Sequence, residues 1–239
     1  MTTLFISDLH LVDSRPDTTR LLQRFLLEEA VNADALYILG DLFEFWLGDD
    51  VPSKSSVEVA SALFSLTEKG VPCYFMHGNR DFLLQHDYAK SAGMTLLPEE
   101  HVADLYGEQV LLMHGDSMCT DDIPYQQFRR MVRDANWQKG FLAMTPQERL
   151  QVAMQARDAS AEHKGNVSMD IMDVNQGEVI AAFERHGLTR MIHGHTHRPA
   201  IHDLEISGHA AQRIVLGDWY TQGSVLRVDP GSYTLSAIV

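Results

Sequence analysis

The stretch Leu36-Tyr37-Ile38-Leu39-Gly40-Asp41 decides the fold, because a run of strand-forming residues ends abruptly in a glycine and a carboxylate. Four other stretches have the same pattern, with the runs Leu4-Phe5-Ile6, Cys73-Tyr74-Phe75-Met76, Val110-Leu111-Leu112-Met113 and Met191-Ile192. Short β-branched and aromatic runs predict buried strands. The polar clusters that follow are Asp8-Leu9-His10, Gly40-Asp41, Gly78-Asn79-Arg80-Asp81, Met113-His114-Gly115-Asp116 and Gly194-His195-Thr196-His197.

These five clusters predict a single site. Open α/β sheets place their sites at the carboxyl ends of strands. The clusters lie far apart in the sequence, so only a fold that gathers strand ends brings them together. A lone Asp-x-His or Gly-Asp is common in loops and turns, so the signal is the number of clusters and not any one of them.

Helical segments alternate with the strands, which predicts a layered α/β architecture. Residues 18–31, 56–69 and 175–186 carry apolar positions or capping signals typical of helices, with a helix start expected at Ser56. Asn175 and Glu178 form a capping-box pattern, and Gly187 marks the helix end. From Ala200 onward, residues 201–206, 213–216, 224–228 and 233–238 predict four antiparallel strands.

Residues 122–172 fit a different pattern and are expected to be almost wholly helical. Thr145-Pro146-Gln147-Glu148 combines an N-cap, a proline at the first helical position and a capping glutamate. It predicts a helix that runs to about Ala161. We interpret 122–172 as a helical cap inserted within a single domain that covers residues 1–239.

Composition limits the function classes. A chain of 239 residues with a formal charge of -14 is expected to be one domain and not a general nucleic-acid binder, which normally has a basic face. Two cysteines make no disulfide framework, which favours a reducing cytosol. No run approaches the roughly 18 apolar residues of a spanning helix. Since Asp8 already belongs to the site, we expect no cleaved signal peptide.

Basic residues gather in the middle third of the chain, and two interpretations remain open. They form either a solvated helical face or a patch for an anionic substrate or an anionic membrane surface. The residues are Arg129, Arg130, Arg133, Lys139, Arg149, Arg157 and Lys164.

D-x-H, G-D, G-N-x-[DE], H-G and G-H-x-H, in this order from residue 8 to residue 197, resemble the calcineurin-like metallophosphoesterase superfamily. The resemblance implies a four-layer α/β/β/α sandwich that holds two divalent metal ions. It assigns one ion to Asp8, His10, Asp41 and His197, and the other to Asp41, Asn79, His114 and His195. Oxygen and nitrogen ligands without thiolate favour Mn²⁺ over a structural zinc site.

Within that superfamily, several longer stretches are similar to the UDP-2,3-diacylglucosamine diphosphatase family. They are Ile6–Leu11, Tyr37–Glu44, Met76–Leu83, Met113–Asp116, Cys119–Asp122 and His193–Pro199. The similarity implies hydrolysis of a pyrophosphate in lipid A biosynthesis, giving 2,3-diacylglucosamine 1-phosphate (lipid X) and UMP. It implies attack by a two-metal-bridged hydroxide on the α phosphorus, with acyl chains held between cap and core.

The same similarity implies site residues. Asp41, Asn79, Arg80 and His195 are expected to be catalytic, and Asn79, Arg80, Asp122, Ser160, Lys164 and His195 to bind substrate. The chain departs from the family where Lys164 replaces an asparagine and Val167 replaces a lysine. Lys164 could supply the missing charge from about one helical turn away, or it could be a solvated helix lysine.

Arg80 is the residue that best distinguishes between the possible reactions. Many superfamily members have a histidine here as a general acid, and an arginine cannot serve because its pKa is above about 12. It can instead clamp phosphate oxygens bidentately. A phosphate leaving group, with a second pKa of about 6, needs little protonation to depart. We hypothesise that Arg80 suits a pyrophosphate and not an alkyl phosphoester.

A substrate with two acyl chains implies work at the cytoplasmic face of the inner membrane, with peripheral attachment. Trp137, Phe141, Leu142 and Met144 are expected to supply the apolar contact with an anionic surface, beside Lys139. His77 and His193 also precede glycines and are expected in the core or behind the ligands.

Two alternatives remain. The first is another dinuclear metallophosphoesterase that acts on a nucleotide such as diadenosine tetraphosphate or a cyclic nucleotide. The helical insertion and Arg80 discriminate, because a small nucleotide needs no acyl chamber. The second is a non-catalytic scaffold, which would be expected to have lost ligands.

Overall fold

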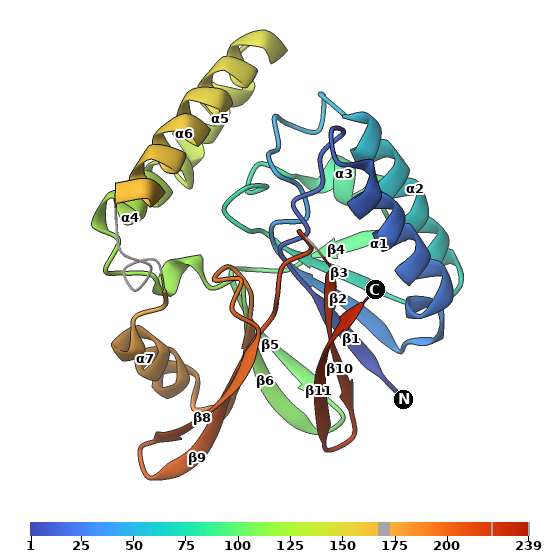
Figure 1. Cartoon of the computed structure of the whole chain (residues 1–239), viewed down its shortest axis with the longest axis vertical. Coiled ribbons are helices and arrows are strands. Elements are labelled where there is room, and N and C mark those ends of the chain that lie inside the picture. Colours follow the sequence, from blue (N-terminus) through green and yellow to red (C-terminus); the bar gives the residue numbers. More distant parts are fainter. Residues whose placement is uncertain (167–172, 221, 239) are drawn as a thin grey trace.

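Two β-sheets pack face to face, and helices cover their outer faces (Figure 1). The computed structural model describes the backbone of residues 1–166, 173–220 and 222–238, and the side chains of these residues except 158–166. Both termini lie at the ends of strands of the same sheet.

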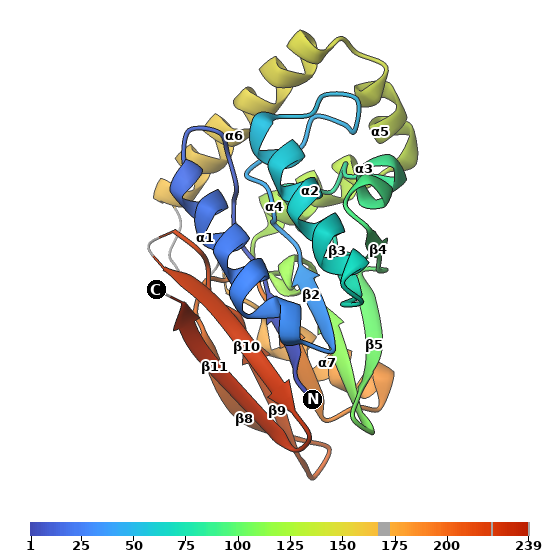
Figure 2. The same cartoon turned by 90° about the vertical axis from the view of Figure 1, so that its right-hand side faces the viewer.

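The first sheet has the strand order β11-β10-β1-β2-β3-β4. Its parallel half is β1 (Thr3–Ile6), β2 (Ala35–Leu39), β3 (Cys73–Met76) and β4 (Met94–Leu96), and the hairpin β10 (Gly223–Asp229) and β11 (Ser232–Ile238) joins antiparallel to β1. Figure 2 shows α1 (Pro16–Glu28) and α2 (Lys54–Glu68) side by side on its outer face. The short η1 (Ala30–Asn32) and α3 (His86–Ser91) complete this half.

The second sheet has the order β5-β6-β7-β9-β8. Its strands are β5 (Glu100–Leu105), β6 (Glu108–Met113), β7 (Arg190–His193), β9 (His209–Val215) and β8 (Ala200–Ile206). β6, β7 and β9 run parallel, and β5 and β8 close the two edges antiparallel. Its outer face packs against α7 (Gln176–His186), and η2 (Asp116–Met118) follows β6.

The layers follow from the two-residue period of strand side chains. In β2, Leu36 and Ile38 belong to the core beneath α1 and α2, whereas Tyr37 and Leu39 belong to the core between the sheets. Every residue of β2 is therefore buried, which explains its continuous apolar run. A third core lies between the second sheet and α7. The predicted α/β/β/α sandwich is confirmed.

The five apolar runs are β1, β2, β3, β6 and β7, as predicted. The four strands expected after Ala200 are also present, but they form two hairpins in different sheets. β4, β5 and α3 were not anticipated. β4 has only three residues, too few for a periodic signal.

Helix boundaries depend on their caps. Ser53 caps α2, and Ser56 is the third residue of its capping box, so the start expected at Ser56 was wrong. At α7 the Asn175 side chain accepts from the amides of Gly177 and Glu178, and Gly187 ends the helix with φ 64°, as predicted. The helix that begins at Pro146 runs to Asn166, beyond the expected end near Ala161.

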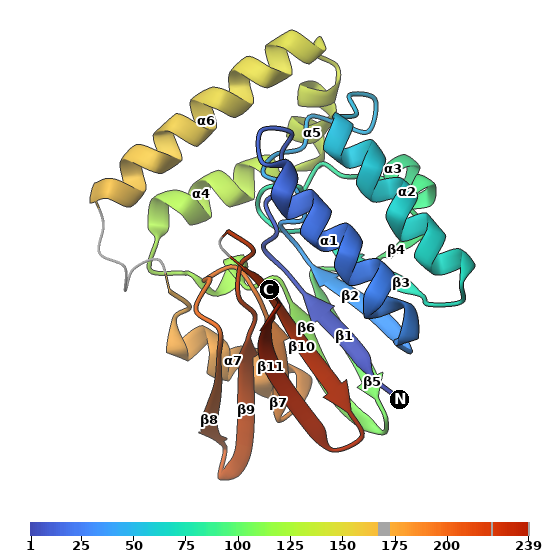
Figure 3. The same cartoon turned by 45° about the vertical axis from the view of Figure 1, so that its right-hand side comes forward.

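Three helices follow η2: α4 (Ile123–Val132), α5 (Ala135–Leu142) and α6 (Pro146–Asn166). Figure 3 shows them on the side of the molecule toward which β1 and β2 run. We call α4–α6 the cap helices. No helix in the part of the chain that the structure describes is long and apolar enough to cross a bilayer.

The cap helices correct two expectations from the sequence. Phe141 is 4% exposed and belongs to the core beneath α1 and α2, and Trp137 and Leu142 pack against the same core. Trp137 also stacks on Phe141, so among the four apolar residues expected at a membrane only Met144 is exposed. These side chains attach the cap to the core, because burial on protein removes more of their apolar surface from water.

The basic patch is corrected for three of its members. Arg149 is 4% exposed, pairs with Asp50 at 2.6 Å, and donates to the main-chain carbonyls of Leu47 and Met144. Arg129 and Arg133 both pair with Glu99. These arginines connect the cap helices to the segment between β2 and α2 and to Glu99 just before β5, and they do not form a free cationic surface.

Candidate metal centre

The ends of β1, β2, β3, β6 and β7 converge and bring the predicted ligands into two groups. The first cluster is Asp8, His10 and His197. Nε2 of His10 lies 3.3 Å from Nε2 of His197, which in turn lies 3.3 Å from Oδ1 of Asp8. Three ligand atoms from two different sheets therefore face a common point.

The second cluster is Asp41, His114 and His195. The amide oxygen of Asn79 lies 3.1 Å from Nε2 of His114 and 2.9 Å from Nδ1 of His195. The structure thus gathers all seven residues that the resemblance named as ligands.

Asp41 lies between the two clusters. One carboxylate oxygen, Oδ2, is 3.8 Å from Nε2 of His10, and the other, Oδ1, is 3.8 Å from Nε2 of His114. A carboxylate that offers one oxygen to each side is the geometry needed to bridge two ions.

The backbone at these ligands is unusual. Asp8, His10, Asp41, His195 and His197 all have positive φ, between 50° and 71°. A non-glycine residue in this region costs on the order of 1–2 kcal/mol and persists only where surrounding structure enforces it. The turn at each strand end directs these side chains back across the carboxyl ends of the sheets.

Two glycines permit the close approach of these turns. A Cβ on Gly78 would lie 2.1 Å from Oδ1 of Asp41, and a Cβ on Gly40, where φ is 89°, would lie 2.5 Å from Nδ1 of His114. Asp81 braces the same turns, because its fully buried carboxylate accepts from the amides of Leu42, Phe43 and Gly78. Burial and the neighbouring Asp41 raise the pKa of Asp81 to about 7.

The residues fit a divalent cation. Oδ1 of Asp8 is buried, and no hydrogen-bond donor reaches it from the residues that the structure describes. The nearest ionisable neighbour of this oxygen is the imidazole of His197 at 3.3 Å, so its charge is offset either by a proton on that ring or by a bound cation. Two ligands bonded to one ion at about 2.0–2.2 Å are separated by roughly 3.0–3.5 Å. Nε2 of His197 lies at such a distance, 3.3 Å, from both Nε2 of His10 and Oδ1 of Asp8, whereas the latter two atoms are 4.0 Å apart.

Charge at the clusters also favours cations. Burial opposes the charged form of His197, but the carboxylates of Asp218 and Asp8 outweigh it and raise its pKa to about 10. A bound cation could replace that proton. Burial and then the positive charge of His114 lower the pKa of His195 to about 3, which favours the neutral imidazole with a lone pair on one of its two ring nitrogens.

The cap helices reach the second cluster through α4. The hydroxyl of Tyr125 donates to Asp116 at 2.8 Å, and its ring stacks on His195 with 6.0 Å between centroids. Arg129 donates to the same carboxylate, and Arg133 donates to the carbonyl of Gly78 at 3.0 Å. α4 therefore covers one side of the centre.

The remaining residues predicted from the sequence are not among the candidate metal ligands. The amide of Arg80 donates to Asp41 at 2.8 Å, and its guanidinium influences Glu44 and Tyr220 electrostatically. Asp122 is 6% exposed and caps α4 by accepting from the amide of Tyr125. Ser160 and Lys164 lie on α6, and their side chains are outside the described residues. His193 is buried, and His77 is partly buried with its ring at the carbonyl of Leu84.

Three further residues, Glu44, Asp218 and Tyr220, contact the first cluster and were not predicted from the sequence. Oε2 of Glu44 lies 3.2 Å from Nδ1 of His10, and Oδ2 of Asp218 lies 3.1 Å from Nδ1 of His197. The ring of Tyr220 stacks on His10 with 5.2 Å between centroids. A signal existed, because Leu216-Gly217-Asp218 after an apolar run repeats Leu39-Gly40-Asp41.

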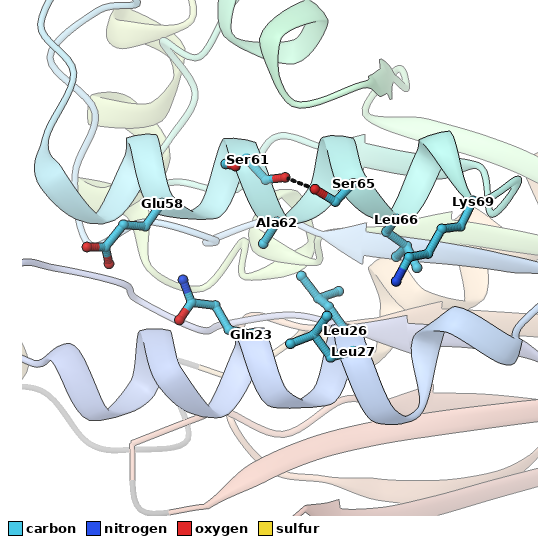
Figure 4. Close-up of a pocket in the computed structure, with 9 residues that line it drawn as sticks. All are labelled: Gln23, Leu26, Leu27, Glu58, Ser61, Ala62, Ser65, Leu66 and Lys69. Carbon is cyan, nitrogen blue, oxygen red and sulfur yellow. Dashed lines mark hydrogen bonds between the residues drawn. The ribbon is translucent and has the colours of Figure 1, made fainter.

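Two surface hollows differ in their relation to the centre. A groove of about 260 Å³ between α1 and α2 is lined by helix residues such as Gln23, Leu27 and Lys69, and none of the candidate ligands lines it (Figure 4). A hollow of about 290 Å³ adjoins the first cluster at His197 and Asp218.

Comparison with known proteins supports this view of the centre. Residues 1–199 match the calcineurin-like phosphoesterase family. The chain is 56% identical over 245 residues to a UDP-2,3-diacylglucosamine hydrolase of Stenotrophomonas maltophilia strain K279a, with 100% of this chain and 99% of that protein covered. It is 52% identical to the protein of the same name from Serratia proteamaculans, with 98% of each chain covered.

Among solved structures, an archaeal phosphodiesterase shares the fold with a TM-score of 0.51, 12% sequence identity and full coverage of both chains. The family match covers all five strand-end clusters. The relative that matches over almost its full length is also named a hydrolase. The chain therefore belongs to the calcineurin-like phosphoesterase family.

Proposed function

We propose that this protein hydrolyses the pyrophosphate bond of UDP-2,3-diacylglucosamine, releasing lipid X and UMP in lipid A biosynthesis. The observation that carries the proposal is the 56% identity, over the whole of both chains, to a protein named UDP-2,3-diacylglucosamine hydrolase. The assembly of both clusters around Asp41 supports a catalytic protein over a scaffold.

In this proposal Asp8, His10, Asp41 and His197 hold one divalent ion, and Asp41, Asn79, His114 and His195 hold the other. When bound, the two ions would supply Lewis acidity at the phosphoryl oxygens and would activate water for attack on the α phosphorus. Manganese is the expected metal because the donors are oxygen and nitrogen without thiolate. Asn79 and His195 orient the substrate phosphate from the second cluster.

Arg80 offsets charge on the phosphates. The amide of Arg80 donates to Asp41, so the backbone at Arg80 is held beside the metal centre. An arginine donates bidentately to phosphate but cannot protonate a leaving alkoxide. We infer that the leaving group is a phosphate, which departs without a general acid.

The cap helices supply the remaining contacts of the proposal. Asp122, Ser160 and Lys164 contact the sugar, amide or phosphate region, and the acyl chains lie between cap and core. The Asp122 side chain also caps α4 by accepting from the amide of Tyr125, so it sits at the start of the cap helices.

We also propose peripheral attachment to the cytoplasmic face of the inner membrane, since the substrate carries two acyl chains. Trp137 and Phe141 are unsuited because they pack inward. Ile123, Met131 and Met154 of the cap helices are 61%, 48% and 57% exposed and are the better candidates for that contact. Flotation with vesicles that contain anionic lipid, at low salt, tests this, and wild-type protein that remains at the bottom contradicts it.

Hydrolysis of three substrates, each with and without Mn²⁺, tests the main proposal. We expect Mn²⁺-dependent release of UMP and lipid X from UDP-2,3-diacylglucosamine. Diadenosine tetraphosphate and bis-p-nitrophenyl phosphate should react far more slowly, because neither fills an acyl chamber. Faster turnover of the nucleotide or of the simple diester would overturn the substrate and leave the metal centre standing.

A further inference from the structure

The two histidines of the first cluster share one feature. Their Nε2 atoms face each other across 3.3 Å, and both face Asp8. A neutral imidazole that offers a lone pair at Nε2 carries its proton on Nδ1. The residues beside Nδ1 therefore decide which nitrogen is free for a cation.

A carboxylate stands at ion-pair distance from each of these Nδ1 atoms, although Nδ1 of His10 makes no directed hydrogen bond within the described residues. Glu44 is 3.2 Å from His10, and Asp218 is 3.1 Å from His197. Glu44 follows β2 by a few residues, and Asp218 lies in the connection from β9 to β10. The neighbouring Trp219 amide donates to the carbonyl of Asp8 at 3.1 Å, so this connection is anchored to the first cluster.

Glu44 has two further, longer contacts. Arg15 and Arg157 lie 3.9 Å and 3.8 Å from its oxygens. Both distances exceed the 3.2 Å to Nδ1 of His10, so His10 is the nearest of these three partners of Glu44. Tyr220 then covers the first cluster, with its ring 5.2 Å from His10 and 5.6 Å from His197 between centroids.

The second cluster is built differently. Nδ1 of His114 lies 2.8 Å from the main-chain carbonyl of Leu39, and His195 faces Asn79 with its Nδ1. Across the described side chains, Asp41 is the only carboxylate within ion-pair distance of either histidine. A carbonyl also fixes a tautomer, but it adds no formal charge.

We propose that Glu44 and Asp218 are positioning residues that make the first cluster the tighter of two cation sites. They favour a proton on Nδ1 of each histidine, orient Nε2 toward Asp8, and place a carboxylate at ion-pair distance from each ring. The buried Asp116, which acts electrostatically on His114 and His195, lies beyond that distance and is paired with Arg129. Outer carboxylates of this kind raise the basicity of a ligating histidine, and their loss typically weakens metal binding about 10–100-fold. The inference rests on the two-ion centre of the proposed function.

Mn²⁺ titration of the metal-free protein tests it without substrate. The electron paramagnetic resonance signal of free Mn²⁺ gives the number of ions bound and both dissociation constants. Wild type is expected to bind two ions with unequal affinity. Glu44→Gln and Asp218→Asn should each weaken the tighter site about 10–100-fold and leave the weaker constant unaltered.

Reference variants assign each constant to a cluster. His197→Ala should abolish the tighter site, and His195→Ala should spare it. Glu99→Gln and Asp203→Asn make the same chemical changes at carboxylates that contact Arg129 and Gln212 and no candidate ligand, so both constants should stay at the wild-type values. The Glu44 and Asp218 variants act independently, so misfolding of one leaves the other as a test.

The titration results distinguish a failure of the roles of Glu44 and Asp218 from a failure of the dinuclear centre. Unaltered constants in both variants, or equal weakening at the two sites, overturn the roles of Glu44 and Asp218. Loss of the tighter site in His195→Ala overturns its assignment to the first cluster. A wild-type protein that binds fewer than two Mn²⁺ ions overturns the dinuclear centre itself.

Discussion

Individual residues at this centre combine ligand chemistry with unusual backbone geometry. Asp8, His10, Asp41, His195 and His197 all adopt the left-handed region, where β-carbons crowd the backbone. Gly40 and Gly78 have no Cβ, which leaves space for the neighbouring ligand side chains. The sequence pattern of a glycine beside a ligand therefore reflects space as well as turn geometry.

Gly78→Ala is predicted to disable the centre while the protein stays folded. The new Cβ would lie 2.1 Å from Oδ1 of Asp41 and 2.4 Å from its amide nitrogen, so Asp41 must move. A shift of the shared carboxylate should weaken Mn²⁺ binding and lower activity at least about tenfold, since outer changes alone have effects of this size. Mn²⁺ titration and hydrolysis assays measure both.

Gly140→Ala is the matched control. Gly140 lies within α5, and apart from the local helix backbone no atom of the described residues lies within 4 Å of a Cβ placed there. Alanine should therefore stabilise α5 by up to about 1 kcal/mol and leave Mn²⁺ binding as in wild type. Wild-type Mn²⁺ affinity in Gly78→Ala would contradict the prediction.

Among the secondary-structure elements, one unit recurs: a strand that ends in a polar cluster. The cap helices are a separate insertion between two of these units. The repeated unit was recognisable because its strands are buried on both faces. The cap was recognisable as helical from Thr145-Pro146-Gln147-Glu148, where the Thr145 and Glu148 side chains each bond to the other's backbone. Which side of each cap helix faces inward was not recognisable, and the membrane-facing role of Trp137 and Phe141 was wrong.

Arg149→Ala is predicted to loosen the cap helices. The buried guanidinium joins α6 to Asp50 and to the carbonyls of Leu47, Leu142 and Met144. Its removal leaves these carbonyls without their donor, at a cost of about 2–4 kcal/mol. Hydrogen exchange should rise in α5 and α6 and stay slow in β1–β3.

Arg20→Ala serves as the control, because Arg20 pairs with Asp17 on the surface of α1 and both side chains are largely exposed. Its effect should stay within about 0.5 kcal/mol. Unchanged protection of α5 and α6 in Arg149→Ala would show that other contacts hold the cap.

At the scale of the whole molecule, the centre is an interface between the two sheets. β1, β2 and β3 of the first sheet supply Asp8, His10, Asp41 and Asn79, whereas β6 and β7 of the second supply His114, His195 and His197. Each cluster contains ligands from both sheets. The centre therefore forms only when the sheets pack.

Metal removal is predicted to destabilise the folded protein. Ions that bind only the folded clusters add about 2.7 kcal/mol per site at 100 times the dissociation constant. Scanning calorimetry should show a lower melting temperature in chelator and a rise with added Mn²⁺. The gain should shrink in His114→Ala, and a wild-type melting temperature that ignores Mn²⁺ would contradict the prediction.

The sequence by itself determined the strand runs, the order of the ligand motifs and the helical nature of the insertion. These are local properties, because burial on both faces of a strand imposes an apolar run and capping uses residues three positions apart. The phosphate-clamping role of Arg80, inferred from the general chemistry of the guanidinium group, remains a prediction. Domain limits and the roles of Ser160 and Lys164 remain predictions.

Only the tertiary structure decided which groups meet. The contact of Glu44 with His10 joins nearby turns, but that of Asp218 with His197 depends on β9 lying beside β7. The split of the last four strands between two sheets, and the inward side of α5, depend equally on packing. Contacts between distant segments arise from the burial of whole faces, and no local pattern specifies which faces pair.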